Sequence, residues 1–183
     1  MGYSFLLDDF MVLRKDLSRC AGSNGLQKTN VVLPDGFEVI GPKTMIEYQC
    51  KKLFIPPSLK TIAYRAFDHA QIAEIDFGRC NLISIEYQAF FGCKAKTALP
   101  DSVKYIGDEA VRDLDLVNEG KLKLPSALRY LGKKAFNLSR VREIQVDEAV
   151  VTQDSNLDAL IAMAEDEGKD GLILSVSREG KEV

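Results

Sequence analysis

The sequence predicts a repeat solenoid, mainly of β-structure with short turns and helical corners, in which about five coils stack on one another. The main evidence is a phrase that recurs along the chain: an apolar residue usually followed by Pro, a second apolar residue, an Ile or Leu often followed by Gly, and finally Ala-Phe. Successive copies are 21 to 25 residues apart, a spacing typical of short solenoid repeats. The Ile or Leu before the Gly position marks each unit, and the five markers are Ile40, Ile62, Ile85, Ile106 and Leu131.

The prolines support the same period. Proline has no N–H to donate to a strand ladder and excludes the preceding residue from helical space, so an apolar residue followed by Pro predicts a short extended segment that then stops. The third unit has Phe77-Gly78 in place of this pair. We expect the chain to turn at the four equivalent prolines, Pro34, Pro56, Pro100 and Pro125.

The remaining repeat positions suit a thin coil. The marker and the apolar residue three positions before it can point into one interior. The Gly after the marker is expected to allow a corner conformation closed to other residues. The Ala-Phe pair, as in Ala66-Phe67, supplies a small residue where coils approach closely and a ring that spans the gap between them. A single coil cannot bury its own apolar face, so stacking over residues 33–146 provides the core.

A second strand follows the Ala-Phe position in several units. Apolar residues alternate with polar ones around Ile72, Ile75 and Phe77 and again over residues 141–146. The apolar side chains are expected to point inward, which leaves the polar ones on the outer surface of a parallel sheet. We expect this outer strand face to be the binding surface, formed by Glu74, Asp76, Lys121, Lys123, Glu143 and Gln145.

Both ends of an open stack need covering, because they expose apolar faces and strand edges. Residues 1–32 are expected to form the N-terminal cap, with an apolar run over residues 3–13, a turn at residues 22–25 and a strand over residues 30–33. The cap and the solenoid are expected to form a single structural domain with the C-terminal segment 147–183.

The C-terminal segment predicts a helix followed by a strand. Ser155 or Asn156 can cap a helix whose apolar positions recur at helical spacing from residue 157 to residue 164, and Gly168 suits its end. A strand over residues 172–176 follows. We expect this helix-strand cap to cover the last coil; a docking helix for a partner is the alternative.

The repeated phrase Pro-x-Ser-apolar-x-x-Ile-Gly-x-x-Ala-Phe resembles the BspA-like leucine-rich repeat, a family of bacterial and protozoan solenoids. The resemblance covers about residues 33–146. It implies a curved leucine-rich-repeat stack with parallel strands on one side, used for adhesion or protein recognition and without catalysis. The chain departs from the family where Val111 replaces the Phe and where Thr44-Met45 replaces Ala-Phe. Residues 112–121 are longer and more polar than their counterparts, so a protruding loop is expected there.

Composition narrows the classes of partner and location. The chain of 183 residues has 24 Lys plus Arg against 27 Asp plus Glu and a net charge of −3, which gives no reason to expect nucleic-acid binding. No apolar stretch approaches the length of a membrane span, so membrane insertion is not expected. The N-terminus lacks the pattern of a secretory signal, which favours a cytoplasmic location, or an extracellular or cell-surface one if a leader has been removed.

Few residues could carry catalysis. Cys20, Cys50, Cys80 and Cys93 show no zinc or disulfide spacing and are expected to be buried free thiols. His69 is the only histidine. A Cys/His enzyme or metal site built from Cys80, Cys93 and His69 is the least favoured hypothesis, and no catalytic residue, metal or cofactor is expected.

The sequence therefore predicts a non-enzymatic recognition module that binds a protein, or less favourably a glycan, across its strand face and the 112–121 loop. The alternative is a structural or adhesive unit that self-associates through its ends or edges. On either hypothesis the protein is a monomer or a weakly self-associating one.

Overall fold

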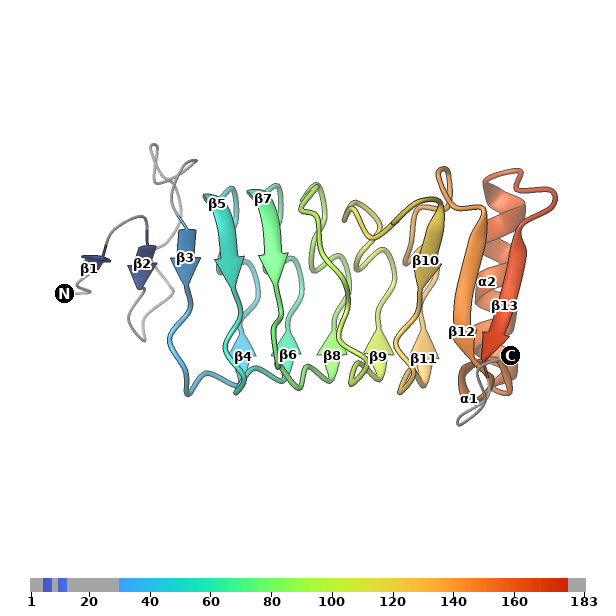
Figure 1. Ribbon diagram of the computed structural model, residues 1–183, viewed down its shortest axis with the longest axis horizontal. Helices are drawn as coiled ribbons and strands as arrows, with labels where there is room; N and C mark the ends of the chain where they lie inside the picture. Colours follow the sequence, from blue (N-terminus) through green and yellow to red (C-terminus); the bar gives the residue numbers. More distant parts are fainter. Residues whose placement is uncertain (1–4, 8–9, 13–29, 178–183) are drawn as a thin grey trace.

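The computed structural model describes residues 5–7, 10–12 and 30–177 of the chain. It consists mainly of short strands, with two helices near the C-terminus (Figure 1). The strands are β1 (Phe5–Leu7), β2 (Phe10–Val12), β3 (Asn30–Val32), β4 (Val39–Ile40), β5 (Gln49–Phe54), β6 (Thr61–Ile62), β7 (Gln71–Asp76), β8 (Ser84–Ile85), β9 (Tyr105–Ile106), β10 (Lys121–Lys123), β11 (Tyr130–Leu131), β12 (Glu143–Asp147) and β13 (Ile173–Ser177), and the helices are α1 (Glu148–Val151) and α2 (Asp154–Asp166).

The chain winds as a solenoid with two strand-bearing sides (Figure 1). On what we call the long-strand side, β1, β2, β3, β5 and β7 form one sheet and β10, β12 and β13 form another. On the short-strand side, β4, β6, β8, β9 and β11 form a single sheet. Within the described residues, the named strands pair in parallel, apart from the antiparallel β1–β2 pair. The predicted parallel solenoid of about five coils is therefore confirmed.

The marker residues align one above another on the short-strand side. Ile40 pairs with Ile62, Ile62 with Ile85, Ile85 with Ile106, and Ile106 with Leu131. The four isoleucines are fully buried and Leu131 is 4% exposed. The residue three positions before each of the last four markers, such as Leu59 and Val103, is also buried. Repetition of the marker thus produces a continuous apolar column through the stack, as the spacing predicted.

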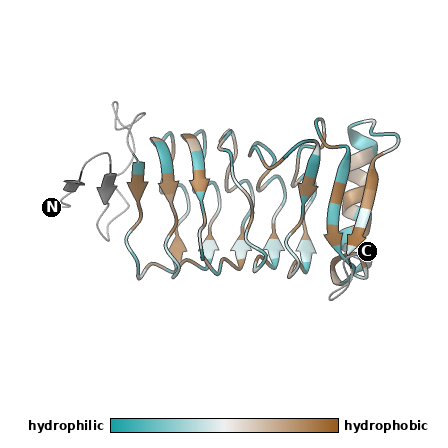
Figure 2. Ribbon diagram, viewed as in Figure 1, coloured by the Kyte–Doolittle hydropathy of each residue, from teal (hydrophilic) through white to brown (hydrophobic). Residues whose placement is uncertain are grey.

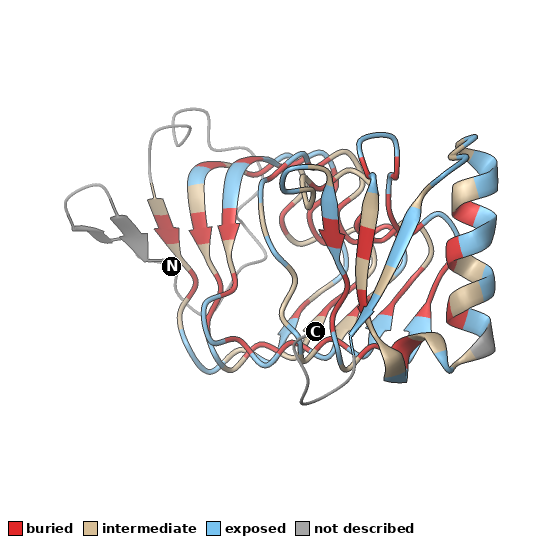
Figure 3. Cartoon of the chain, turned by 45° about the vertical axis from the view of Figure 1, so that its right-hand side comes forward, coloured by how far each residue is buried: buried red, intermediate tan, exposed pale blue. Residues whose placement is uncertain are grey.

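The Ala-Phe pair fills the gap between coils in the expected way. The rings of Phe67 and Phe90 stack with centroids 4.8 Å apart and planes 4° from parallel. Ala66 and Ala89, which precede them, have no exposed surface. Figure 3 shows buried residues recurring from coil to coil along the solenoid. Burial of a phenylalanine side chain contributes about 2 kcal/mol by removing apolar surface from water.

The glycine after the marker has a different role from the one expected. Gly41, Gly107 and Gly132 do not have positive φ angles, so they are not left-handed corners. Instead, an ideal Cβ on Gly107 would lie 2.7 Å from the backbone nitrogen of Tyr87 in the preceding coil. A Cβ on Gly132 would collide with the backbone of Asp108 and Gly107. Glycine is needed here because neighbouring coils approach too closely for a side chain.

The corner expected at that glycine lies two residues later. The residue three positions after each marker has a left-handed backbone with φ between 49° and 56°, although none of these residues is glycine. For an L-residue this conformation costs about 1 kcal/mol or more, so the stacked coils hold five such corners against local preference. These corner residues are Lys43, Arg65, Gln88, Glu109 and Lys134.

The segment 112–121 does not protrude as expected. Leu114 is 6% exposed and belongs to the core, and the backbone N–H of Asp115 donates to the carbonyl of Ala95 at 2.9 Å. Asp115 also bridges in parallel to Lys96. The exposed residues Asn118 and Glu119 lie at a tight turn where Asn118 and Lys121 bond to each other through their backbones. The extra residues run along the stack because Leu114 is buried in the core and Leu116 and Val117 pack against it.

The predicted helix-strand cap is present, with two corrections to its details. Helix α2 follows Gln153, and no side-chain hydrogen bond caps it; Asn156 is fully buried and donates instead to the carbonyl of Val150. The buried positions of α2 include Leu160 and Met163, whereas Ile161, which was expected to pack inward, is 48% exposed. Gly168, with φ of 60°, ends the helix as predicted.

At the other end, β1 and β2 extend the long-strand sheet beyond β3. Three strands thus lie in the described part of residues 1–32, the segment expected to form the N-terminal cap. The turn expected at residues 22–25 and Cys20 lie outside the described residues. None of the helices in the described part of the chain is long and apolar enough to cross a membrane.

Candidate functional site: the long-strand face

The outer face of the long-strand side carries charges in a regular order. Parallel register places Lys52 beside Glu74, Glu74 beside Lys96, and Lys96 beside Asp115. Inward-pointing residues on the same strands, such as Leu53, are buried, and Figure 2 shows both hydrophilic and hydrophobic residues on each of these strands. The outer face of the long-strand side therefore carries a row of alternately positive and negative side chains that runs across the coils from one to the next.

Ion pairs organise this row. Lys52 Nζ lies 2.7 Å from Glu74 Oε1 and 3.1 Å from Asp76 Oδ2, and these hydrogen bonds raise the pKa of Lys52. The hydrogen bond from Lys52 lowers the pKa of Asp76 below its ordinary value, and the N–H of Gly78 adds to that effect. Exposed pairs of this kind contribute about 0–1 kcal/mol to stability. Their main effect is to fix the positions of the charged groups.

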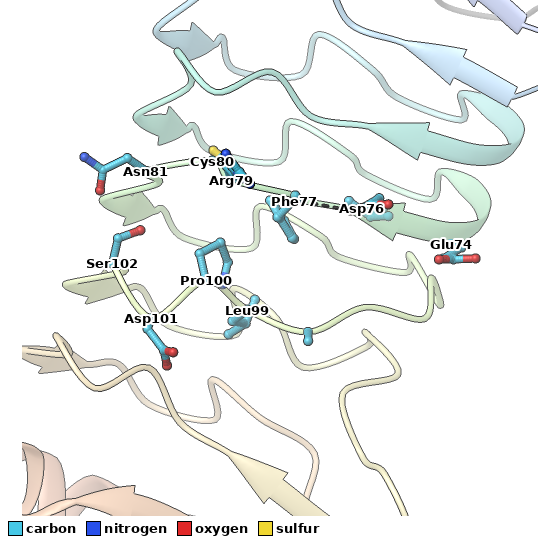
Figure 4. Close-up of a pocket in the computed structure, with 13 residues that line it drawn as sticks. Glu74, Asp76, Phe77, Arg79, Cys80, Asn81, Leu99, Pro100, Asp101 and Ser102 are labelled. Atoms are coloured by element: carbon cyan, nitrogen blue, oxygen red, sulfur yellow. Dashed lines mark hydrogen bonds between the residues drawn. The ribbon is translucent and has the colours of Figure 1, made fainter. Parts of the chain in front are cut away.

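A recess of about 650 Å³ begins at the end of β7, beside the interruption of the strand ladder, and runs from there toward the short-strand side (Figure 4). On the long-strand side no named strand lies between β7 and β10 among the described residues, and single-residue bridges from Lys96 to Glu74 and Asp115 take the place of a strand. Glu74, Asp76 and Asp101 contribute carboxylates to the lining of the recess and Arg79 contributes a cation. The lining therefore has three carboxylates and one cation, and Lys52 and Lys123, which lie outside the lining, pair with all three carboxylates. The lining is completed by Ile75, Phe77, Gly78, Cys80, Asn81, Ala98, Leu99, Pro100 and Ser102.

The structure divides the six residues expected at the binding surface between two places. Glu74 and Asp76 line the recess, and Lys123 reaches its rim by an ion pair with Asp101, 3.0 Å between Nζ and Oδ2. The others lie farther along, on β10 and β12. There Lys121 Nζ lies 3.3 Å from Glu143 Oε2.

Glu143 is the centre of that second group. Its carboxylate accepts hydrogen bonds from Ser175, Gln145 and Lys121, in decreasing order of effect, and these lower its pKa. The amide of Gln145 donates to it at 3.3 Å. Lys121, Glu143 and Gln145 thus form one connected polar group, while Lys123 links this sheet to the recess through Asp101.

The cysteines and the histidine of the hypothetical Cys/His site lie in surroundings that do not favour catalysis. Burial raises the pKa of Cys93 to about 11 and that of Cys50 to about 12, and it also raises the pKa of Cys80. A protonated buried thiol is a poor nucleophile and a poor metal ligand. The ring of His69 lies over Gly92, where a Cβ would come within 2.9 Å of it, and its Nδ1 lies 2.5 Å from Asp68 Oδ1. Among the described residues, no three His, Cys, Asp or Glu side chains are grouped to hold a metal ion.

Comparison with known families identifies this architecture. The model of the BspA type leucine rich repeat region matches residues 20–118 and 75–157, with six copies of the repeat. The chain belongs to the BspA-type leucine-rich repeat family. Comparisons with curated proteins and with solved structures found no match. Repeats of this family form interaction or adhesion modules and are generally not enzymes. The match begins before and ends after the segment 33–146, so the family repeat extends beyond the five units recognised in the sequence.

The BspA-type solenoid also has a candidate surface that the sequence reasoning missed. On the short-strand side, Tyr105 and Tyr130 stack with ring centroids 4.8 Å apart, and Tyr64 and Tyr87 stack at 5.7 Å. Tyr87, Tyr105 and Tyr130 are 40–47% exposed. Tyr64 and Tyr87 lie two residues after the markers of consecutive units, and Tyr105 and Tyr130 lie one residue before the markers of consecutive units. This repetition is the sequence signal that could have predicted the surface. Tyrosine is enriched at protein interfaces.

Proposed function

We propose that this chain is a protein-recognition module that binds a protein partner across the long-strand face and the recess that begins there. The observation that carries the proposal is the combination of an ordered charge row with a recess of about 650 Å³ at the break in the strand ladder. A fixed pattern of charge selects a partner, because wrong pairings bring like charges together. Membership of a repeat family that provides extended interaction surfaces supports this function.

The recess favours a basic group on the partner. Its lining includes the carboxylates of Glu74, Asp76 and Asp101 and the single cation Arg79. Lys52 and Lys123 bind these carboxylates from outside the lining and leave lone pairs on them for further donors. A lysine or arginine side chain of the partner can therefore enter the recess and bind one of these carboxylates.

A double substitution tests this placement. In Glu74→Gln/Asp101→Asn, two carboxylates become neutral amides of the same shape, so the fold is kept while the attraction for a basic group is lost. We expect the affinity for a partner isolated with the wild-type protein to fall on the order of 10-fold or more, as for loss of charge pairs that are partly shielded from water. The control is Glu38→Gln, an exposed carboxylate next to the short-strand sheet. Equal affinities for the double variant and the wild type would contradict the proposal.

The tyrosine surface is the second candidate for the same function, favoured by its exposed aromatic rings. A Tyr87→Ala/Tyr130→Ala variant removes one ring from each stacked pair. Binding through the long-strand face predicts that this variant keeps wild-type affinity within about twofold, as is normal for residues outside an interface. A larger loss in this variant than in Glu74→Gln/Asp101→Asn would move the binding surface to the short-strand side.

A further inference from the structure

The large apolar side chains that remain exposed in the described part of the chain gather in two regions. One is the short-strand side and its flanks, and the other is the C-terminal cap. At the cap, Ile161, Ile173, Leu174 and Val176 are 48%, 59%, 39% and 47% exposed. Strand β13 carries three of these four residues, and Figure 3 shows exposed residues along it and along α2.

Strand β13 is the last strand of its sheet, and one of its edges is unpaired by any described strand. The N–H of Ile173 donates to the carbonyl of Arg142, so Ile173 directs its backbone groups toward β12. In a strand, successive residues direct these groups to opposite edges. Ser175 and Ser177 therefore bond toward β12, and Leu174 and Val176 present their N–H and C=O groups at the free edge.

The same two residues face the interior of the coil. Leu174 is in register with Ile144 and Val176 with Val146, and both partners on β12 are buried. Leu174 lines an apolar groove of about 500 Å³ between β13 and α2, together with Leu157, Leu160, Ile161, Ala164 and Leu172. Residues 171–177 include no charged side chain and no proline. Solvent-exposed edges usually carry such residues to prevent pairing, so this edge lacks the normal protection against another strand.

We propose that the edge is a self-association site, where β13 of a second copy of this chain pairs antiparallel with β13 about a twofold axis at Ser175. The free backbone groups of Leu174 then bond to those of Val176 of the partner subunit, in both directions, which satisfies the edge. The apolar side chains of these two residues meet on the inward side, next to the groove. This register also overlaps all five residues of both strands, and no charge opposes it.

Self-association of this kind uses a surface separate from the recess and does not depend on the proposed partner binding.

Two strands of five residues bury less area than the roughly 800 Å² per partner of a stable interface. The dimer is therefore weak and reversible, and it forms as the concentration of the protein rises. Sedimentation equilibrium of the wild-type protein measures this dimerisation as an increase in mean molecular mass between about 10 μM and about 1 mM protein. Weak contacts typically have dissociation constants in this range.

A pair of cysteine variants tests the register. In the proposed dimer Ser175 lies opposite Ser175 of the partner subunit at a non-hydrogen-bonded position, where the Cα atoms are about 4.5 Å apart and a disulfide can form. Ser177 lies opposite Ile173 of the partner subunit, so its own counterpart is roughly 13 Å away at about 3.4 Å per residue. Both substitutions are made in a Cys20→Ser background. Under mild oxidation we expect Ser175→Cys to give a covalent dimer and Ser177→Cys to stay monomeric.

A charged edge variant completes the test. Leu174→Lys introduces an edge charge at a partly exposed position, and circular dichroism checks that the fold is kept. We expect this variant to remain a monomer at concentrations where the wild type dimerises. A wild-type protein that is monomeric up to about 1 mM, equal cross-linking of both cysteine variants, or assemblies larger than a dimer would each overturn the proposal. The last result indicates head-to-tail stacking through the two ends of the solenoid.

Discussion

Replacement of Gly107 by alanine tests the close stacking of the coils. The added Cβ would lie 2.7 Å from the backbone nitrogen of Tyr87 and 3.0 Å from the carbonyl carbon of Glu86. Both atoms belong to the backbone of the preceding coil, so a side-chain rotation cannot relieve the contact and the coils must move apart. Overpacking of this kind costs about 3 kcal/mol, and in a protein of this size each kcal/mol lowers Tm by about 2–4 °C. We therefore expect Gly107→Ala to lower Tm by about 6–12 °C.

The matched control is Gly41→Ala at the equivalent position of the first unit. There the nearest atom to the new Cβ is the hydroxyl oxygen of Thr44 at 3.2 Å, which belongs to a side chain that can rotate. Because alanine also reduces the entropy of the unfolded chain, we expect the free energy of unfolding to change by about 0.5 kcal/mol or less. Urea unfolding followed by circular dichroism measures both variants. Equal stability of Gly107→Ala and Gly41→Ala would refute the explanation of glycine by close approach of the coils.

Three further predictions concern the core, the thiols and the corners. Phe90→Ala removes a fully buried ring that stacks on Phe67, and we expect it to reduce the free energy of unfolding by about 3–5 kcal/mol in urea titrations; a loss below 1 kcal/mol would contradict the continuous core. Because burial raises the pKa of Cys93 to about 11, the thiol loses its proton at a lower pH in the unfolded state than in the folded one. The contribution of this thiol to the free energy of unfolding is therefore fully present below about pH 8.5 and falls as the pH rises toward 11. The pH dependence of the free energy of unfolding should be shallower in Cys93→Ala, and an unchanged dependence would refute the role of this thiol. Lys134→Gly relieves a left-handed corner with φ of 52° and should raise the free energy of unfolding by about 0.5 kcal/mol, because the greater freedom of glycine in the unfolded chain offsets part of the relieved strain. Lys134→Ala loses the same exposed pair with Asp166 and should not raise it; equal effects of the two substitutions would show that the corner is not strained.

The sequence was sufficient to predict the features that repeat in register. The marker isoleucines and the Phe67–Phe90 stack follow from the period, because one apolar position per coil becomes a column when coils stack in parallel. The outward direction of Glu143 on β12 follows from alternation along the strand, whereas on β7 the alternation is interrupted at Ala73 and Glu74, which are both exposed between the buried Ile72 and Ile75. These features depend only on spacing, which one sequence contains.

Features that depend on the distance between coils could not be predicted in the same way. The role of Gly107 depends on the position of Tyr87 in another coil, and local sequence suggested a corner instead. Leu114 anchors the segment 112–121 although the polar residues around it suggested an exposed loop. The recess arises from a missing strand between β7 and β10, and the only sequence sign of that irregularity was Phe77-Gly78 in place of the proline pair.

The tyrosine surface differs from these cases because its signal was present in the sequence. Tyr64 and Tyr87 follow their markers by two residues, and Tyr105 and Tyr130 precede theirs by one. Comparison of the polar and aromatic positions between units, in addition to the apolar ones, identifies such pairs. Stacking of equal side chains in adjacent coils is what a parallel register produces.

Site-specific cross-linking tests the central claim that the long-strand face binds a protein partner. A photoreactive benzoylphenylalanine replaces Lys96, which is exposed on the charge row beside Glu74, or Arg129, which is exposed beside the short-strand sheet. With a partner isolated on the wild-type protein, we predict an ultraviolet-dependent adduct from position 96 and none from position 129. An adduct from position 129 alone would contradict the placement of the binding surface.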